Sequence, residues 1–304
     1  MSKNIVAVDL GNINTVAVSN EKEIIIESRL KQYEQGADDF NPNENFECDG
    51  IKYISNSGKY ENNLLKYQKD NYLSLLYYSI TSVTDFNNIN LITCIPASQY
   101  KKKDELQKYL EKNNKKSIII NGKKRNIILE NISVLPESYS FKADRKLMNR
   151  INRNVDTVII DTGGFTTDIS LFDNNMNLKD ANSINLGMLN LYQNSREYLN
   201  VQYDLNISLE DAKDIFDGNK QLLNSDFSYK SEIVKRFIVN LINEIKILYP
   251  NLKNSNLILV GGGSNILYPT MKKLYSQTII DDDVKLQSRC LYKIGEKLFK
   301  WVGG

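Results

Sequence analysis

Two short stretches of this chain place an aspartate at the end of an apolar strand and a glycine turn directly after it. The clearer one is Val158–Leu171, which reads VIIDTGGFTTDISL. Its apolar run ends at Asp161, a turn over residues 162–167 follows, and apolar alternation then resumes. Because glycines lack a Cβ, such a turn can direct several backbone N–H groups at one phosphate, while the carboxylate faces an accompanying cation. Taken alone, an ordinary hairpin explains this stretch equally well.

A second copy of the pattern lies near the N-terminus. Val6–Val18 reads VAVDLGNINTVAV, in which Asp9, Gly11 and Thr15 keep the offsets of Asp161, Gly163 and Thr167. Two such hairpins, about half a chain apart, predict two related halves that present phosphate-binding turns to each other across a cleft.

Composition limits the class of protein. The 304 residues are enough for two domains at ~150 residues each, and 41% hydrophobic residues can build real cores. Lys and Arg total 39 against 37 Asp and Glu, a net charge of +2. Sequence-independent binding to nucleic acid normally requires a clearer basic excess, so we expect no direct nucleic-acid contact. The local lysine clusters are interpreted as solvated surface.

The chain has no histidine, which excludes histidine acid–base chemistry and histidine metal ligation. Its three cysteines, Cys48, Cys94 and Cys290, are far apart, as is typical of a reducing compartment. No apolar run approaches the ~18 residues of a membrane span, and the N-terminus resembles a strand rather than a signal peptide. We therefore expect a soluble, cytoplasmic protein with no membrane partner.

Periodicity predicts the elements that position the first motif. Strands are expected at 5–8, 16–18, 23–26 and 91–95, a helix with apolar positions such as Leu64 and Leu65 at 62–80, a helix at 100–113, and a hairpin of 118–120 with 127–129. Residues 31–60 are polar and are interpreted as a small inserted lobe with weak strands. A short strand then ends at Pro136, and Glu137 follows it at the mouth of the expected cleft. A glutamate there is by itself best explained as the first turn of a helix, favoured by the helix dipole; we expect that helix to link the halves.

The second half is predicted to continue the hairpin with a strand into Gly187, followed by helices near 189–198, 208–218 and 231–249. A strand at 256–260 then runs into Gly261, Gly262 and Gly263, with a helix beginning near Ser264. Backbone without side chains can pass close to a base or ribose, and a helix N-terminus favours negative charge. Following the phosphate hairpin, this arrangement favours nucleotide binding over a wide turn. The last helix, 287–300, is expected to return to the first half.

The motifs DLGNINT, LPES, DTGGFTTD and LVGGGSN, in this order, resemble the phosphate 1, connect 1, phosphate 2 and adenosine motifs of the actin superfamily. Within it the chain is similar to the plasmid-segregating bacterial actins of the ParM/StbA type. LITCIPASQY before a lysine-rich helix, INLGMLNLY after phosphate 2, and LQSRCLYKIGEKL near the end are similar to that branch. The resemblance covers nearly the whole chain.

This resemblance implies an α/β, two-domain actin-like (ribonuclease H-like) fold with a central nucleotide cleft. Domain I would comprise 1–150 and 285–304, with the inserted lobe at about 31–60, and domain II would comprise 151–284, with an outer lobe at about 200–250. The cleft would hold ATP or GTP with Mg²⁺, bound by Asp9 and Asp161 through waters. Residues implied to border the nucleotide are Asp9, Gly11, Asn12, Ile13, Gly163, Gly164, Phe165, Thr166, Gly187, Gly261, Gly262, Gly263 and Ser264.

The resemblance also changes the interpretation of Glu137, which would orient the attacking water while Asp161 holds the metal. It implies a nucleotide-hydrolysing protein that assembles into polar filaments, with a role in plasmid segregation and an adaptor protein that binds the plasmid centromere. Two positions depart from the pattern: Val16 stands where related actins carry a lysine, and Lys213 and Phe216 occupy the register of two ribose contacts.

Three other functions use the same superfold. A small-molecule kinase shares the phosphate hairpins, since fold does not determine function, but we find no acceptor-binding insertion and no aspartate placed as a base for a sugar hydroxyl. A cell-shape or division actin is a second alternative, although no amphipathic membrane helix is evident. A chaperone-type nucleotidase would require a peptide-binding domain after the last helix, which we do not expect.

Overall fold

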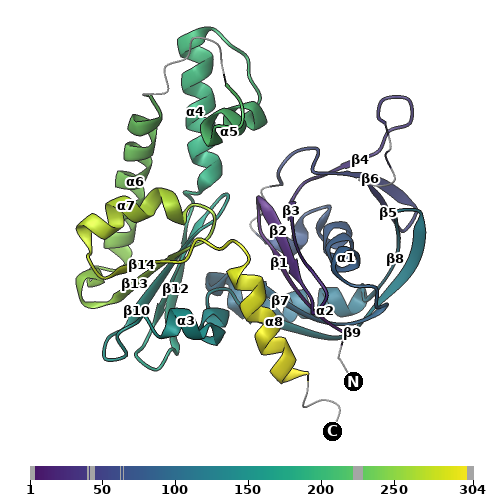
Figure 1. Ribbon diagram of the computed structural model, residues 1–304, viewed down its shortest axis with the longest axis horizontal. Coiled ribbons are helices and arrows are strands. Elements are labelled where there is room, and N and C mark those ends of the chain that lie inside the picture. Colours follow the sequence, from purple (N-terminus) through teal and green to yellow (C-terminus); the bar gives the residue numbers. More distant parts are fainter. Residues whose placement is uncertain are drawn as a thin grey trace. The chain divides into compact units, whose positions relative to one another are not determined.

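The structure is a computed structural model that describes residues 4–39, 41, 45–61, 63, 65–221 and 229–299. It divides into two compact units, one formed within 1–150 and 284–304 and the other within 151–283. Each unit is built on one β-sheet with its own helices (Figure 1). We describe them in turn.

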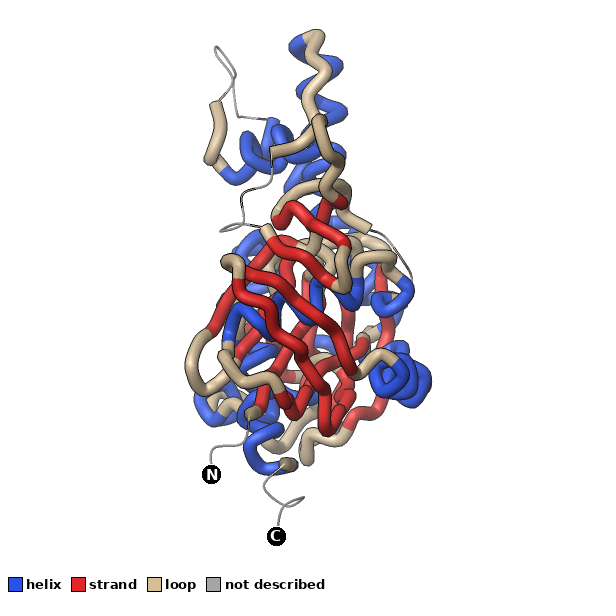
Figure 2. Tube along the Cα trace, turned by 90° about the vertical axis from the view of Figure 1, so that its right-hand side faces the viewer, coloured by secondary structure: helices blue, strands red, loops and turns tan. Residues whose placement is uncertain are grey.

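The first unit has a nine-stranded sheet in the order β3-β2-β1-β7-β9-β8-β5-β6-β4. Its strands are β1 (Ile5–Leu10), β2 (Asn14–Val18), β3 (Glu23–Glu27), β4 (Leu30–Gln32), β5 (Phe46–Cys48), β6 (Ile51–Ser55), β7 (Asn88–Ile95), β8 (Lys115–Ile120) and β9 (Lys123–Pro136). Strands β1, β7 and β9 pair in parallel, while β1–β2–β3 and β8–β9 are antiparallel. Figure 2 turns the right-hand side of Figure 1 toward the viewer, so that strands (red) run across the front of the view.

Helical segments cover both faces of the first sheet. They are the 3₁₀ helices η1 (Lys66–Gln68), η2 (Ala97–Lys102) and η3 (Tyr139–Ala143), and the α-helices α1 (Tyr72–Val83), α2 (Lys103–Lys112), α3 (Arg145–Met148) and α8 (Leu286–Leu298). The sheet curls round α1 (Figure 1). Since side chains alternate along a strand, Val6 and Val8 join the core that contains α1, whereas Ile5 and Ala7 join the cluster that contains Leu291 of α8. Helix α8 thus returns to the first unit, as predicted.

The second unit has a five-stranded sheet in the order β12-β11-β10-β13-β14. Its elements are β10 (Thr157–Thr162), β11 (Thr167–Phe172), β12 (Leu178–Ile184), α4 (Met188–Tyr203), α5 (Leu209–Asp217), α6 (Tyr229–Leu248), η4 (Leu252–Asn254), β13 (Asn256–Val260), α7 (Ser264–Leu274) and β14 (Thr278–Ile280). Strands β10, β13 and β14 are parallel, and β10–β11–β12 is an antiparallel meander. This repeats the order and sense of β3-β2-β1-β7-β9, in agreement with the two related halves inferred from the duplicated hairpins.

Three sequence predictions need correction. The helix expected at 62–80 begins only at Tyr72, because Lys66 and Lys69 bond inward to Glu137 and Asn12 from a 3₁₀ turn; Asn62 and Leu64 lie outside the described residues. The strands of the expected inserted lobe extend the main sheet, since β5 pairs with β8.

In place of the linking helix expected from Ser138 onward, the structure has the 3₁₀ helix η3 and the four-residue α3. Ser138 has φ +66°, a left-handed conformation that an α-helix cannot contain. At the other end of the chain, Lys300 of the predicted last helix lies outside the described residues.

No helix in the part of the chain that the structure describes combines the length and the hydrophobicity that crossing a bilayer would require.

Helix α6 offers a matched test of the second core. Leu241 is fully buried, whereas Ile247 on the same helix is 76% exposed. We expect Leu241→Ala to lower the free energy of unfolding by about 2–5 kcal/mol, since it leaves a cavity, and Ile247→Ala to change it by less than about 0.5 kcal/mol. Urea unfolding followed by circular dichroism measures both. Equal effects would contradict the orientation of α6.

Candidate functional site

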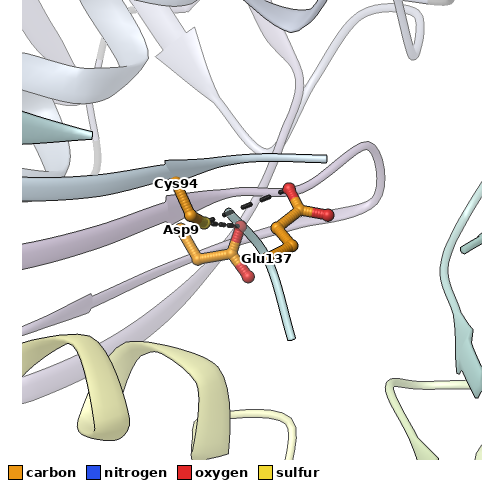
Figure 3. Close-up of side chains that lie close together, drawn as sticks. All are labelled: Asp9, Cys94 and Glu137. Atoms are coloured by element: carbon orange, nitrogen blue, oxygen red, sulfur yellow. Dashed lines mark hydrogen bonds between the residues drawn. The ribbon is translucent and has the colours of Figure 1, made fainter. Parts of the chain in front are cut away.

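Three chemically active side chains meet at the carboxyl ends of neighbouring parallel strands in the first unit. Asp9 is near the end of β1, Cys94 near the end of β7, and Glu137 directly follows β9. The Glu137 N–H donates to the carbonyl of Ile95 (2.8 Å), which continues the β7–β9 ladder past Pro136. The potential ligand atoms of Asp9, Cys94 and Glu137 all lie within 4.8 Å of one another (Figure 3). Ligands of open α/β sheets bind at this edge.

The Cys94 thiol is the hydrogen-bond donor of this cluster. Burial, with further contributions from the Asp9 and Glu137 carboxylates, raises the pKa of Cys94 well above its usual value, so the thiol stays protonated. Its Sγ donates to Asp9 Oδ1 (3.5 Å) and lies 4.0 Å from Glu137 Oε1. A protonated thiol is a poor metal ligand, so the carboxylates are the groups that could hold a cation. The thiol orients the Asp9 carboxylate.

Lys66, which the sequence analysis missed, is the counter-ion of Glu137. Its Nζ donates to Glu137 Oε1, and the Glu137 residue is 6% exposed. Burial alone would lower the pKa of Lys66, but the carboxylates of Glu137 and Asp9 outweigh that effect and raise it well above its usual value. Lys66 is therefore a permanent cation in the site. One feature of the sequence could have indicated this role: Lys66 and Lys69 are three residues apart, where the predicted helical pattern required apolar side chains.

The turn after β1 is held tightly. A Cβ on Gly11 would lie 2.5 Å from the carbonyl oxygen of Asn14, so only glycine fits. Asn12 Oδ1 accepts a hydrogen bond from Lys69 Nζ (2.8 Å). The Ile13 carbonyl accepts one from the Ser28 N–H (2.7 Å). Three of the predicted binding residues, Gly11, Asn12 and Ile13, therefore form one ordered turn next to Asp9.

The corresponding turn of the second unit joins β10 to β11. The Gly163 N–H donates to the Thr166 carbonyl (2.9 Å) and closes the turn. Asp161 lies directly opposite Asp168 on the paired strands, and Thr166 Oγ1 donates to Asp168 Oδ2 (3.0 Å). Two carboxylates facing each other across a hairpin repel, and a bound cation would relieve that repulsion.

Gly187 connects this turn to helix α4. The backbone N–H groups of Met188 and Leu189, the first residues of α4, donate to the carbonyls of Gly163 (2.9 Å) and Gly164 (2.8 Å). A Cβ on Gly187 would lie 2.4 Å from the Gly164 carbonyl oxygen. The predicted residues Gly163, Gly164 and Gly187 are thus in contact because no side chain separates them.

The three glycines after β13 pack against the end of β10. Gly261 has φ +82°, and a Cβ there would lie 2.2 Å from Asp161 Oδ1; one on Gly263 would lie 2.5 Å from Thr162 Cγ2. Gly262 has open space beside it. The hydroxyls of Thr162 and Ser264 are buried and have no hydrogen-bond partner among the described residues. This edge therefore combines close backbone approach with unused hydrogen-bonding groups.

The predicted residues thus fall into two clusters, one in each unit, which we call the first and the second half-site. The first comprises Asp9, Gly11, Asn12, Ile13 and Glu137, joined by Lys66, Lys69 and Cys94. The second comprises Asp161, Gly163, Gly164, Phe165, Thr166, Gly187, Gly261, Gly262, Gly263 and Ser264. Outside both, Phe216 is buried against Tyr192, and Lys213 lies 4.0 Å from Asp217.

The chain is similar to known proteins both in sequence and in fold. Residues 7–139 match the family model described as the N-terminal domain of actin-like proteins. Among solved structures, a ParM in a 15-stranded filament from Clostridium botulinum superposes with a TM-score of 0.82 at 17% identity, over 98% of this chain and 100% of that one. This chain has the actin-like fold.

Two further solved structures are similar to this chain in fold. The apo ParM of psk41 gives an actin-like match with a TM-score of 0.72 at 20% identity, over the full length of both chains (100% each). The archaeal actin homologue Ta0583 in complex with ADP gives 0.81 at 16% identity, over 97% of this chain and 99% of that one. No curated protein matches the sequence. The predicted fold, and the likeness to ParM in fold, are confirmed.

The neighbouring glycines 261 and 262 give a matched test of the second half-site. We expect Gly261→Ala to lower the free energy of unfolding by about 1–3 kcal/mol, because a residue with a Cβ is strained at this φ and the added atom would meet Asp161. Gly262→Ala, with open space around it, should change it by less than about 0.5 kcal/mol. Urea unfolding compares the two. Equal stability would contradict the close approach of Gly261 to Asp161.

Proposed function

We propose that this protein is a bacterial actin that binds ATP or GTP with Mg²⁺, assembles into polar filaments in the nucleotide-bound state, and hydrolyses the nucleotide. The observation that carries the proposal is the duplicated strand-end site, in which an aspartate and a glycine turn occupy the same place in the five-strand arrangement that the two sheets share. The likeness in fold to a ParM filament and to an ADP-bound actin homologue supports it.

The side chains present fit a magnesium nucleotide. Carboxylate oxygens are the donors that Mg²⁺ prefers, and both half-sites supply them, from Asp9 in the first and from the opposed Asp161 and Asp168 in the second. Glycines with open space beside them, such as Gly262, admit a ligand close to the backbone. When bound, Mg²⁺ would neutralise charge on the phosphates.

Glu137 is the proposed water-orienting residue. Phosphoryl transfer to water needs a positioned nucleophile and charge stabilisation rather than covalent catalysis. The Lys66 ammonium and the Ile95 carbonyl hold Glu137 at its side chain and its backbone. A carboxylate fixed in this way can accept a hydrogen bond from a water and direct its oxygen at the terminal phosphate. The glycine turns would contribute backbone N–H donors to the phosphate oxygens.

Nucleotide binding would then control assembly. A ligand shifts a conformational equilibrium only through different affinities for the two states, and the terminal phosphate is the group whose loss changes that affinity. Hydrolysis would therefore destabilise the filament. We further propose a cytoplasmic role in plasmid segregation, with a separate adaptor protein bound at the plasmid centromere. A net charge of +2 supports contact with DNA through an adaptor rather than directly.

Light scattering and electron microscopy of the purified protein, with Mg-ATP, with Mg-GTP and without nucleotide, test the proposal. We expect filaments with at least one nucleotide and their disassembly as phosphate is released. Absence of both assembly and hydrolysis with either nucleotide would overturn it. Turnover without filaments, dependent on a small-molecule acceptor, would indicate a kinase instead.

Glu137→Gln tests hydrolysis separately from assembly. We expect phosphate release to slow by about 10²–10⁴-fold, the usual effect of losing a group that positions a reacting proton or water, while filaments still form and persist longer. Phosphate release is followed by a coupled colorimetric assay. Release at the wild-type rate would show that Glu137 has another role.

The Glu137→Gln variant needs a second variant as its control, because it leaves the buried Lys66 cation without its carboxylate. Breaking one side of a buried ion pair commonly costs about 3–5 kcal/mol of stability, and unfolding would imitate a loss of activity. The double variant Lys66→Met, Glu137→Gln removes both charges, so we expect its thermal stability to recover. If it hydrolyses nucleotide at the wild-type rate, Glu137 is not the water-orienting residue.

Asp161→Asn tests the proposed metal site. We expect loss of measurable Mg-nucleotide affinity in titration calorimetry, since the amide cannot neutralise the cation, although it should relieve the repulsion from Asp168 and preserve the fold. Asp85→Asn, at an exposed position of the other unit, serves as the control. Equal affinities for wild type, control and Asp161→Asn would contradict the assignment.

A further inference from the structure

The first phosphate-binding turn receives no positive charge from its own hairpin. Val16 on β2 lies directly opposite Asp9 on β1, and its side chain is buried in an apolar cluster with Ile5 and Ala7. The turn itself, Gly11–Ile13, has no charged side chain. Any cation that meets a phosphate at this turn must therefore come from another segment.

Lys69 reaches the turn from the segment before α1. In a 3₁₀ turn residues three apart stack on the same side, and the N–H of Lys69 closes η1 onto the carbonyl of Lys66. Both lysines therefore point into the site, yet to different acceptors. Lys66 bonds to the Glu137 carboxylate, whereas Lys69 bonds to the uncharged amide oxygen of Asn12 at 2.8 Å.

The charge of Lys69 is incompletely balanced. The residue is only 8% exposed, and none of the ion pairs formed within the described residues includes it. Burial and the neighbouring Lys66 cation lower the pKa of Lys69 to about 8, opposed only by the Glu61 carboxylate. A buried ammonium next to another cation is costly, and an arriving anion would stabilise it.

Glu61 is the carboxylate that could compete with a bound phosphate for the Lys69 ammonium. It lines the same small cavity as Lys69, Gly11 and Tyr72. Asn71 donates to its Oε1 (2.7 Å), while its Oε2 is buried and has no hydrogen-bond partner within the part of the chain that the structure describes. The acid is thus close enough to attract Lys69 but is not bonded to it, and Lys69 remains directed at the Asn12 turn.

We propose that Lys69 is the phosphate-binding cation of the first half-site, carried to the turn Gly11–Ile13 by η1, and that it exchanges its bond with Asn12 for one with a phosphate oxygen of the bound nucleotide. Lys66 cannot take this role because Glu137 already holds it. The inference rests on the proposed nucleotide binding and adds a specificity residue to it: it makes the site select for a polyphosphate over an uncharged nucleoside.

Calorimetric titration with Mg-ATP and with magnesium tripolyphosphate tests this on three variants of the full chain. Lys69→Met removes the charge at similar length and should weaken binding of both probes by roughly 10- to 100-fold, the usual worth of a hydrogen bond to a charged group. Lys69→Arg keeps the charge and should stay within about threefold of wild type, well under the tenfold that 1.4 kcal/mol would represent. Lys59→Met, at an exposed position of the same segment, is the control.

Proton uptake gives a second measurement on the wild-type protein, which does not depend on how a variant folds. Phosphate binding should raise the pKa of Lys69 above about 8, so binding at pH 8.5 should take up protons, and affinity should fall as the pH rises from 7 to about 9.5. The groups that face Lys69 are Lys66, Glu61, Asn12 and Tyr72. Lys69→Arg should abolish both the uptake and this pH dependence.

The outcomes separate this inference from the proposed function. Wild-type affinity in Lys69→Met, with no proton uptake in wild type, would overturn the inference and leave nucleotide binding intact. Tripolyphosphate binding that depends on Lys69, in a protein that binds neither Mg-ATP nor Mg-GTP, would support Lys69 as a phosphate-binding cation but overturn its nucleotide ligand and the proposed function. Binding of none of these probes would overturn both.

Discussion

A buried lysine balances the negative charge that three parallel strands gather at one edge of the first sheet. Parallel pairing of β1, β7 and β9 brings Asp9, Cys94 and Glu137 within 4.8 Å. Two carboxylates that close would repel in a poorly hydrated site, and Lys66 offsets that repulsion. The ion pair is an expensive way to stabilise a fold. Its value is that it holds a carboxylate in a fixed direction where a reaction would need one.

The second unit builds its edge by a different physical means. Close approach of glycines dominates there: Gly187 packs on the backbone of Gly164, and Gly261 packs on the side chain of Asp161, at distances that exclude a Cβ. The N-terminus of α4 is bonded to the turn carbonyls. One sheet topology, used twice, therefore supports a half-site rich in charge and a half-site rich in bare backbone.

The regular elements of both units could be predicted because strands and amphipathic helices leave a periodic hydrophobic signal. The predictions were wrong where contacts with residues far away in the chain overrode a local sequence pattern. The apolar periodicity before Tyr72 favoured a helix, but the ion pair of Lys66 and the bond from Lys69 to Asn12 required a 3₁₀ turn. The polar segment 31–60 favoured a separate lobe, yet its strand β5 pairs with β8 and so joins the segment to the main sheet. The sequence of a short polar segment does not indicate which distant strand its backbone will pair with.

By itself, the sequence determined the duplicated aspartate–glycine turns, the order of the four motifs and, through them, the actin-like fold, since strand-ending carboxylates and glycines are local features of the chain. Only the tertiary structure decided which side chains surround those turns. Lys66, Lys69 and Cys94 are 57, 60 and 85 residues beyond Asp9 in the chain and reach the same edge through strand register and one 3₁₀ turn. Charge balance in a buried site depends on neighbours in space, and no periodicity along the chain records it.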